Sequence, residues 1–529
     1  MTTTGHLFVM QGDLTRLSCD AILLPCDSAL DVSAHWSGLL PAGATPHLGR
    51  IRLDGPAGSD GLVSVSSADS QRPVYAFVAV EAAELTPADV VERTAGAVQS
   101  AAGRLATAPT GAGRAVPLLA LPLVGTGQGG LARRRGEVVR DLVPALQGVA
   151  AESGVDIVLV AWTRADHVAM QAARGATPGW SQLDQPGGHL LDRADTIGGW
   201  AAKGELSLFI GAGASVPTGL PSWKDLLAEI GGGQPTGDTA DALMDHASRL
   251  AATMGENDLK QAVADATTTS VHAISHGLLA GLRTGRVVTT NYDPCFELAS
   301  AGVGDGDGED VAEGDGLLRV MTRHLPSGAG PWLLKLHGDV KDAVRIVITR
   351  ADYERLARED HALRGVVQSL MLTSHLLFVG YSLADEDFAD LAAGVVDVRG
   401  RAAPAGRSPG TVLALSAYEE KRLEKSCAAR GLDIVPIGTD DVSAAARLLE
   451  IFLDRVAWRA ATQRADSAAY LLDDAYESSL GTADRALKAA LRALGDRPDA
   501  ADSPAWPHVR ELLERLGEPP HMRPTGRVD

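Results

Sequence analysis

Short apolar runs alternate with segments of helical spacing along most of the chain. In the first third, the apolar runs have the length and bounding turns of strands, and the segments at 90–105 and 138–149 have the spacing of amphipathic helices. Strands that alternate with helices predict an α/β sheet with helices on its faces. The predicted strands of this part are residues 6–10, 20–25, 74–80, 116–121 and 155–160.

The same alternation returns after a turn-rich, apolar-poor stretch near 174–196. Its predicted strands are 207–210, 286–289, 332–336, 345–349, 376–379, 411–415 and 432–437, and its predicted helices are 240–254, 259–282 and 441–496. We therefore expect an α/β fold. Its predicted parts are a three-layer N-terminal domain (1–175), a linker (176–195), a Rossmann-like domain with a parallel sheet (196–460) and a helical tail with a disordered end (461–529).

The composition narrows the class of protein. The chain has 529 residues, 45% of them hydrophobic, which is enough for two or three globular domains. Its formal net charge of −19 argues against nucleic acid as the main partner, because neutralising phosphates needs clustered Lys and Arg. Residues 1–20 lack the pattern of a secretory signal, and the most apolar window, 370–383, is too short to span a bilayer. We expect a cytoplasmic protein without a membrane segment.

The four cysteines, Cys19, Cys26, Cys295 and Cys427, form no CxxC pair. Their spacing argues against a four-thiolate zinc module and against a disulfide framework. The acidic stretch at 301–316 lacks the glycine that a calcium loop needs at its sixth position, so we interpret it as a solvated insertion. We expect no metal site and no zinc.

Four predicted strands of the second domain end in glycine or polar residues, at 211–213, 290–293, 335–338 and 380–382. Glycines let a backbone approach a diphosphate, and the amides of a turn and its following helix donate hydrogen bonds. Each tip alone has a plainer explanation, since glycine turns close many strand–helix joints and Asn is a common turn former. Because the carboxyl ends of parallel strands share one edge of a sheet, the four tips together predict one ligand cleft.

Three features of the first domain stand together: GDLT at 12–15, DAI at 20–22, and a glycine-rich loop at 125–130 that leads into a helix. In these features the domain resembles a macro domain. The resemblance implies that an aspartate reads adenine and that the glycine loop holds the phosphates of ADP-ribose. The positions it indicates are Asp20 for the adenine and Gly125, Thr126, Gly127 and Gly129 for the phosphates.

Residues 24–30, with the sequence LPCDSAL, depart from the macro family, whose members carry an asparagine-rich strand end and a glycine run there. This departure argues against ADP-ribose hydrolysis and favours a binding or sensing role. The alternative is a degenerate domain with only a packing role.

The four tips of the second domain read GAGAS at 211–215, TTNYD at 289–293, KLHG at 335–338 and GYSL at 380–383. In these motifs and their order the chain resembles the sirtuin-like family, more closely its bacterial antiphage (Thoeris-like) branch than the protein deacetylases. The resemblance implies an extended pocket that binds NAD⁺ as the substrate.

The resemblance also implies a role for each matching residue. Asn291 would position the ribose and an attacking water, His337 would act as general base or hold the ribose hydroxyls, and Asp293 would contact the carboxamide. Gly211, Ala212, Gly213 and Ser215 would hold the diphosphate, Gly380 and Ser382 would lie by the adenosine, and Thr290 is a further residue at NAD⁺.

Cleavage of the nicotinamide glycosidic bond passes through an oxocarbenium-like state, and a histidine suits the removal of a proton from water at neutral pH. Sirtuin deacetylases carry a four-cysteine zinc ribbon, which this chain lacks. We therefore predict hydrolysis of NAD⁺ to ADP-ribose and nicotinamide. The alternatives are a non-catalytic NAD- or ADP-ribose-binding assembly component and a sirtuin-type protein deacylase or ADP-ribosyltransferase.

The fusion of a macro-like with a sirtuin-like domain suggests regulation. Effectors of Thoeris-type defence systems resemble the second domain and pair it with a module that senses an ADP-ribose-derived signal. We expect residues 1–175 to bind such a nucleotide and to release NAD⁺ hydrolysis in an NAD-depleting antiphage effector. We also expect a homo-oligomer, with a partner defence protein as a further candidate.

Overall fold

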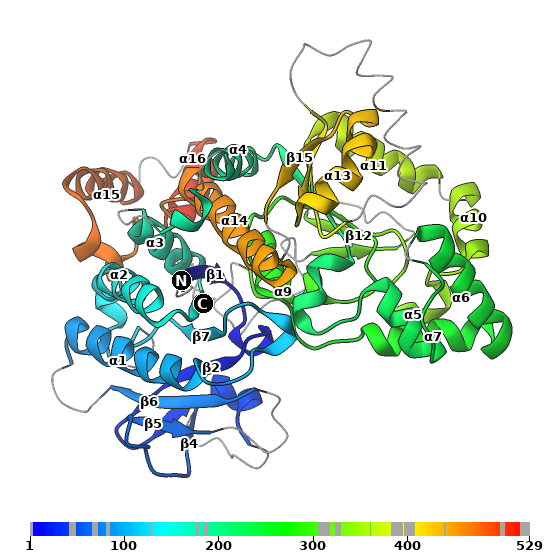
Figure 1. Cartoon of the computed structure of the whole chain (residues 1–529). Helices are drawn as coiled ribbons and strands as arrows, with labels where there is room; N and C mark the ends of the chain where they lie inside the picture. The colour runs from blue at the N-terminus through cyan, green and yellow to red at the C-terminus, as the bar shows by residue number, and fades with distance from the viewer. Residues whose placement is uncertain are drawn as a thin grey trace, which may run out of the picture.

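The chain forms two lobes in its computed structural model, each built on one parallel or mostly parallel sheet (Figure 1). This confirms the α/β class predicted above. The structure describes residues 4–41, 49–65, 72–80, 85–126, 130–175, 179–184, 189–237, 239–304, 318–322, 330–359, 361–381, 395, 408–438, 441–497 and 503–518.

The first sheet has six strands in the order β1-β8-β7-β2-β6-β5. β5 runs antiparallel to β6, and the other neighbours are parallel. The strands are β1 (Leu7–Gln11), β2 (Ala21–Asp27), β5 (Leu62–Ser64), β6 (Val74–Val80), β7 (Leu118–Pro122) and β8 (Asp156–Ala161), and β3 (Asp31–Ser33) pairs separately with β4 (Arg50–Arg52).

Successive side chains of the first sheet enter different cores, as the period of two in a strand requires. Leu7 and Val9 pack with helices α1 and α2, whereas Phe8 and Met10 pack on the opposite face. This arrangement gives the three layers expected of the first domain. The helices of this lobe are α1 (Pro87–Leu105), α2 (Arg135–Ser153) and α3 (Arg164–Arg174), with short 3₁₀ turns η1 (Leu14–Arg16), η2 (Ala34–Leu39), η3 (Gly111–Gly113) and η4 (Ala132–Arg134).

The second sheet has seven parallel strands in the order β11-β12-β10-β9-β13-β14-β15. From β9 the chain continues to β10 on one side and later returns to β13 on the other, so the order reverses between β9 and β13. Ligands bind at this switch point in doubly wound sheets. The strands are β9 (Leu206–Ile210), β10 (Arg286–Thr289), β11 (Arg319–Met321), β12 (Trp332–Lys335), β13 (His375–Val379), β14 (Gly410–Ala414) and β15 (Asp433–Pro436).

Helices cover both faces of the second sheet. One face packs against α4 (Leu190–Ala202), α8 (Ile274–Gly281), α9 (Cys295–Ala301) and α14 (Val442–Gln463), and the other against α11 (His361–Thr373) and α13 (Ala417–Ala429). A smaller cluster beside the strand ends contains α5 (Trp223–Gly231), α6 (Ala240–Met254), α7 (Glu256–Thr267) and η8 (Val340–Arg345), and α10 (Arg350–Glu359) contacts α6.

The two lobes share one hydrophobic core. The same cluster of buried side chains contains Phe8 of the first sheet, Leu208 of the second sheet, and Phe452 and Val456 of α14. Helix α14 crosses between the lobes in Figure 1 and packs along α4. Hydrophobic burial therefore joins the sheets through a common layer of helices.

Ion pairs buried in this layer tie α14 to the first sheet. Asp454 accepts hydrogen bonds from Arg174 Nη1 at 2.9 Å and from Trp180 Nε1 at 2.9 Å, and it lies 2.9 Å from the imidazole of His6. Asp156 of β8 pairs with Arg447 at 2.7 Å. The first domain is therefore completed by a helix that follows the strands of the second sheet in sequence.

The segment 176–195, expected to be a linker, packs against the body in its described part. Trp180 and Leu183 are buried around η5 (Ser181–Leu183), and α4 begins at Leu190. This segment connects the two sheets as part of the shared core.

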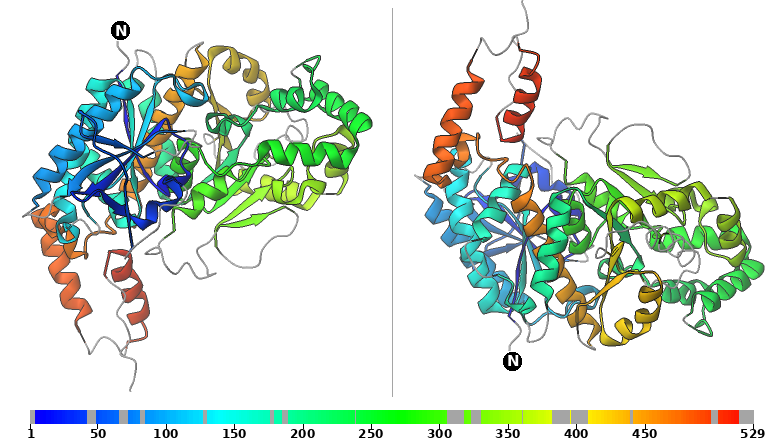
Figure 2. Two further views of the ribbon diagram at one scale, coloured as in Figure 1. Left: turned by 90° about the horizontal axis from the view of Figure 1, so that it is seen from below. Right: turned by 90° about the horizontal axis from the view of Figure 1, so that it is seen from above.

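Three elements differ from their sequence predictions. Residues 345–349 form the end of η8 and an irregular segment rather than a strand, the helix expected at 259–282 is interrupted between α7 and α8, and the helix expected at 441–496 ends at Gln463. After η9 (Asp474–Ser479), the hairpin α15 (Thr482–Gly495) and α16 (Trp506–Arg515) projects from the body (Figure 2). No helix in the described ranges is long and apolar enough to cross a membrane.

Candidate functional site

A cavity of about 560 Å³ opens at the carboxyl ends of β9, β10, β12 and β13, where the sequence predicted a cleft. All four predicted tips contribute to it. The predicted residues that line it are Ala212, Gly213, Ser215, Thr290, Asn291, Asp293, His337 and Gly380. Gly211 lies just behind this wall, and Ser382 is outside the described residues.

The glycines of two tips pack backbone against backbone at the switch point. Gly211 donates to the carbonyl of Val379 at 2.9 Å, and Gly213 donates to the carbonyl of Gly380 at 3.0 Å. Gly380 has a φ of +66°, and a Cβ there would collide with the amide of Ala214. Only glycine combines this backbone conformation with this close approach.

A hydrogen-bond network around Ser215 fixes two side chains of the cavity wall. Ser215, which is 2% exposed, donates from Oγ to Asp293 Oδ2 at 2.9 Å and accepts from Asn291 Nδ2 at 3.1 Å. Asn291 is also buried, and its Oδ1 has no hydrogen-bond partner among the described residues. The bond to Ser215 therefore sets the orientation of the amide, and its carbonyl oxygen is a buried acceptor that no described residue uses.

The loop that carries Asn291 and Asp293 is held in place by hydrogen bonds from Lys335, which is 0% exposed. Its Nζ donates to the carbonyls of Tyr292 at 2.9 Å and Asp293 at 2.8 Å, and to Glu297 Oε1 at 2.7 Å. Burial raises the pKa of Glu297, and the nearby Lys335 opposes that rise. The sequence indicated Lys335 only as part of a strand tip, and the structure gives it an anchoring role.

His337 and two aromatic side chains form another part of the wall. The rings of His337 and Tyr353 meet edge to face, with their centroids 5.1 Å apart. The centroids of the Tyr353 and Trp223 rings are 6.2 Å apart. Gly338 follows with a φ of +97°, which turns the chain back beside Arg345. Trp223 and Tyr353 were not predicted, because they come from helices α5 and α10 that cover the strand ends rather than from the strands.

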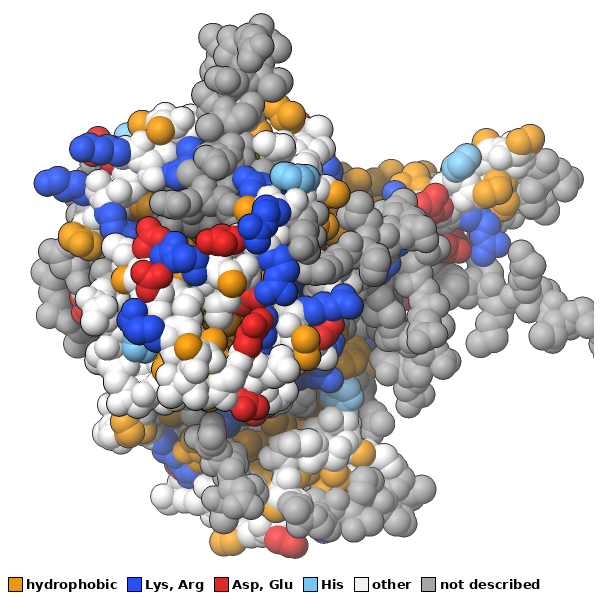
Figure 3. Space-filling view, turned by 90° about the vertical axis from the view of Figure 1, so that its right-hand side faces the viewer, with side chains coloured by type: hydrophobic (Ala, Val, Ile, Leu, Met, Phe, Trp, Pro, Cys, Tyr) orange, Lys and Arg blue, Asp and Glu red, His pale blue; other side chains and the backbone are white. Residues whose placement is uncertain are grey.

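The outer face of the second lobe carries basic and acidic side chains side by side (Figure 3). Arg350 of α10 pairs with Asp241 and Asp245 at 2.8 Å each. Arg350 and Lys224 line the cavity together with the acidic residues Asp293, Glu354 and Glu419, so its wall carries charges of both signs.

A second cavity, of about 390 Å³, lies at the carboxyl ends of β2, β7 and β8 in the first lobe. Gly125 and Thr126 of the predicted glycine loop line it, whereas Gly127 and Gly129 are outside the described residues. Among its other lining residues are Gly12, Leu14, Asp27, Trp36, Arg50, Arg135 and Trp162.

Asp20 does not line this cavity. It precedes β2, at the opposite end of the strand, and its carboxylate accepts from the amides of Gly111 at 2.5 Å and Leu118 at 2.7 Å. These bonds tie the start of β2 to β7 and to the turn η3 that precedes β7. The aromatic residues Trp36 and Trp162 were missed because they lie outside any recognised motif.

Comparison with known proteins extends this picture. Residues 285–435 match the family model described as a SIR2-like domain. The chain contains a SIR2-like domain. The matched range includes the tips at 290–293, 335–338 and 380, and the glycine turn at 211–215 lies before it in sequence but beside it in the sheet.

The curated relatives include two proteins named NAD(+) hydrolase ThsA. The chain is 26% identical over 183 residues to the one from Cytobacillus dafuensis, a match that covers 34% of this chain and 36% of that relative. It is 27% identical over 192 residues to the one from Enterococcus faecium, covering 35% and 38% respectively. The chain thus spans little more than a third of the length of these relatives.

The similar solved structures include two of an Oceanobacillus iheyensis macrodomain, one a mutant and one with MES bound. Each is 14% identical, covers 33% of this chain and 94% of the macrodomain chain, and has a TM-score of 0.25.

Proposed function

We propose that this protein hydrolyses NAD⁺ to ADP-ribose and nicotinamide in the cavity of its SIR2-like domain. The observation that carries the proposal is Asn291, whose amide is held by Ser215 while its carbonyl oxygen remains unpartnered among the described residues of a cavity at the switch point. The relatives named NAD(+) hydrolase support the same reaction.

In the proposed complex, the glycine turn at 211–213 faces the diphosphate, and Gly380 and Ser382 lie by the adenosine. The nicotinamide end reaches Asn291, Asp293 and His337. Ser215 was expected to hold the diphosphate, but its hydroxyl is already bonded to Asp293 and Asn291. We therefore assign Ser215 a positioning role beneath the ribose rather than a phosphate contact.

The reaction needs few groups from the protein. The bond between ribose C1′ and the nicotinamide nitrogen breaks with its electron pair on nitrogen, so nicotinamide leaves as a neutral molecule. A water held by Asn291 forms the new bond to C1′ and passes its proton to His337, which releases it to solvent. A positioned general base of this kind typically accelerates a reaction by about 10²–10⁴.

The test is release of nicotinamide from NAD⁺ by the full chain, measured by chromatography with and without ADP-ribose and cyclic ADP-ribose isomers. Asn291→Ala and His337→Ala are expected to lose about 10²-fold or more in kcat. His361→Ala, an exposed histidine of α11, is the matched control. Unchanged activity in both site variants would exclude this site, and labelled or deacylated protein in place of free ADP-ribose would indicate transferase or deacylase chemistry.

We also propose that a nucleotide derived from ADP-ribose binds the cavity of the first lobe and switches the hydrolase, in a cytoplasmic, homo-oligomeric antiphage effector that depletes NAD⁺. The turn that follows β1 supports a link between the sites. Gly12 and Leu14 line the first cavity. Four residues after Leu14, Ser18 donates to the carbonyl of His272 at 2.8 Å, and His272 donates back to Arg16 at 2.8 Å.

The experiment for this switch uses the full chain. ADP-ribose and cyclic ADP-ribose isomers are titrated by calorimetry, and nicotinamide release is followed at each concentration. Binding together with a change in kcat supports the switch. No binding at millimolar ligand contradicts it. A fall in cellular NAD⁺ after phage infection, in bacteria that express the wild type but not Asn291→Ala, tests the defence role.

A further inference from the structure

The hydroxyl of Ser215 has three nitrogen or oxygen neighbours, and the Cys295 thiol beside it donates to the carbonyl of Val271 at 3.6 Å. Asp293 Oδ2 lies at 2.9 Å, Asn291 Nδ2 at 3.1 Å and His276 Nε2 at 3.4 Å. A hydroxyl has one hydrogen to donate and two lone pairs that accept. The carboxylate can only accept, so it takes the hydrogen, and the amide Nδ2 can only donate, so it takes one lone pair. The remaining lone pair fits a donor, which requires His276 to carry its proton on Nε2.

The surroundings of His276 agree with this tautomer. The side chain lies on α8, is 1% exposed, and its Nδ1 has no hydrogen-bond partner within the part of the chain that the structure describes. An unprotonated Nδ1 leaves only a lone pair unsatisfied, whereas a protonated one would bury an unpaired N–H group. Burial lowers the pKa of His276 to about 4, with Asp293 opposing the shift, so the ring is neutral at pH 7.

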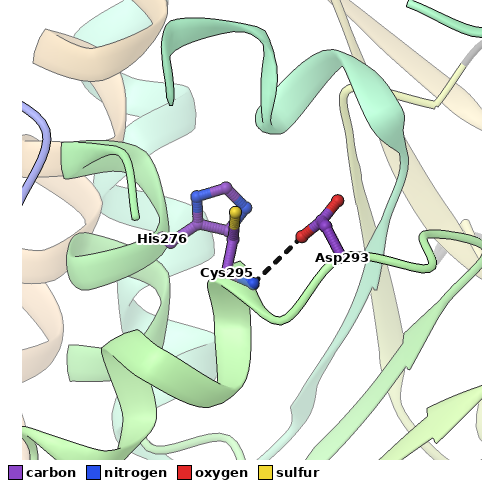
Figure 4. Close-up of side chains that lie close together, drawn as sticks. All are labelled: His276, Asp293 and Cys295. Carbon is purple, nitrogen blue, oxygen red and sulfur yellow. Dashed lines mark hydrogen bonds between the residues drawn. The ribbon is translucent and has the colours of Figure 1, made fainter. Parts of the chain in front are cut away.

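Two other interpretations of this cluster fit less well. A Ser–His–Asp triad places the imidazole between the other two groups, but here Asp293 bonds directly to Ser215. A metal could bind His276, Asp293 and Cys295, whose ligand atoms lie within 4.8 Å of one another (Figure 4). However, both carboxylate oxygens of Asp293 are already bonded, Oδ2 to the Ser215 hydroxyl at 2.9 Å and Oδ1 to the amide of Cys295 at 3.0 Å.

His276 does not line the cavity, so it can act on the substrate only through Ser215. Its N–H fills the last lone pair of the hydroxyl and thereby fixes the direction of the O–H bond toward Asp293. That direction in turn fixes which lone pair receives Asn291 Nδ2. A chain of three side chains thus connects α8 to the unpartnered oxygen of Asn291.

We propose that His276 is a positioning residue of the NAD⁺ hydrolase, which acts as an Nε2–H donor to Ser215 and so holds Asn291 in its productive orientation. This inference rests on the proposed function. It goes beyond the strand tips, because His276 lies in a helix and belongs to none of the four motifs.

The experiment compares steady-state nicotinamide release by the wild type, His276→Gln, His276→Leu, Ser215→Ala and the double variant His276→Leu/Ser215→Ala. The Gln amide can donate at the position of Nε2, so we expect kcat within about threefold of the wild type. The Leu variant has no donor, so we expect about a tenfold loss in kcat with KM unchanged. In the Ser215→Ala background, His276→Leu should cause no further loss, because the two residues act in series.

A merely structural role predicts different results. It would lower kcat by the same factor in both backgrounds, or leave the Gln variant as impaired as the Leu variant, and either result overturns the proposal. Full activity of His276→Leu also overturns it. Absence of nicotinamide release by the wild type with every nucleotide tested would instead refute the proposed function.

A spectroscopic measurement tests the tautomer independently of activity. In wild-type protein labelled with ¹⁵N-histidine, His276 should show a protonated Nε2 and an unprotonated Nδ1 at pH 7. The assignment comes from the signal that disappears in His276→Gln. The opposite tautomer would contradict the proposed donation to Ser215.

Discussion

The two cavities lie at equivalent ends of their sheets but differ in how their polar groups are held. In the SIR2-like cavity, Asn291 and Asp293 are buried and bonded to Ser215 beneath the surface. In the first cavity, Arg50 pairs with Asp27 at 2.7 Å, and both side chains are partly exposed, at 44% and 24%. Groups fixed in advance favour catalysis, because no reorganisation is needed during the reaction. Exposed pairs can exchange partners with a ligand, which suits binding.

The largest expected effect comes from replacing Lys335, which holds the 290–293 loop of the cavity in the SIR2-like domain. Lys335→Met leaves Glu297 and two carbonyls of the 290–293 loop without their buried partner, so we expect a loss of about 3–5 kcal/mol in the free energy of unfolding and of nearly all hydrolysis. Urea denaturation and nicotinamide release measure the two effects.

The double variant Lys335→Met/Glu297→Gln is the control for Lys335→Met. It removes one of the two carboxylates that pair with Lys335, the other being Asp339 at 3.3 Å, and should recover part of the stability, but not the activity, because the two loop carbonyls remain unbonded. Recovery of full activity would show that the loop does not depend on Lys335.

A pH titration tests whether the two regions lose their structure together. Burial alone would raise the pKa of Asp454, but Arg174 and His6 outweigh it and hold the pKa well below its usual range. A carboxyl group with a depressed pKa stabilises the folded protein at any pH above the pKa that it has in the unfolded chain, and this stabilisation is lost as the pH falls. We therefore expect the free energy of unfolding to decrease by about 3 kcal/mol from this group between about pH 5 and pH 2.

Chemical denaturation at each pH measures this decrease, with tryptophan fluorescence and NAD⁺ hydrolysis as separate probes. Asp454→Asn should flatten the dependence. Separate transitions of the two lobes would contradict a shared core.

The variant Asn291→Asp tests whether the hydrogen bond that orients the Asn291 side chain is needed for activity. Asn291→Asp keeps an acceptor oxygen but loses the N–H that bonds Ser215 and adds a charge near Asp293. We expect a loss of about 10²-fold in kcat, close to that of Asn291→Ala. Activity near that of the wild type would show that the acceptor alone suffices.

The first cavity should respond differently, by graded changes in affinity. Trp36→Ala removes an aromatic lining residue, so we expect about tenfold weaker binding of ADP-ribose by the full chain in calorimetry. Trp506→Ala in the projecting helix α16 is the matched control. Equal affinity in both variants would place the ligand elsewhere.

The smallest effect concerns the contact between the lobes. A Cβ on Gly302 would lie 2.6 Å from the amide of Asp13, so Gly302→Ala must shift the turn after β1, whereas a Cβ on Gly304 meets nothing within 4 Å. We expect Gly302→Ala to change the response of hydrolysis to ADP-ribose about threefold, an effect of roughly 0.7 kcal/mol. Gly304→Ala should leave it as in the wild type, and equal responses would contradict coupling through this turn.

Local patterns in the sequence predicted much of this architecture. The strands around Val74 and Leu208 are short apolar runs bounded by turns, and the tips at Gly213, Asn291 and His337 meet because parallel strands share an edge. These features depend on residues that are neighbours in sequence or on a general rule of sheets.

Contacts between distant segments could not be predicted in the same way. Residues 268–273 interrupt the helix that was expected at 259–282. Within this break, the backbone of His272 bonds to Arg16 and Ser18, which follow β1 and are far away in sequence. Asp20 has the sequence position of a ligand-binding carboxylate, but it bonds the amides of Gly111 in η3 and Leu118 in β7, which follow it by 91 and 98 residues. Trp223 reaches the cavity because of how α5 packs, which periodicity does not specify.

Helix α14 also affects the order in which the chain can fold during synthesis. Arg174 is fully buried, and its carboxylate partner Asp454 is translated 280 residues later. At 5–20 residues per second, this delay is about 14–56 s. Until then, the guanidinium of Arg174 and the apolar face around Phe8 lack the helix that covers them. A nascent chain therefore covers this face of its first sheet with α14 only after the strands of the second sheet have been synthesised.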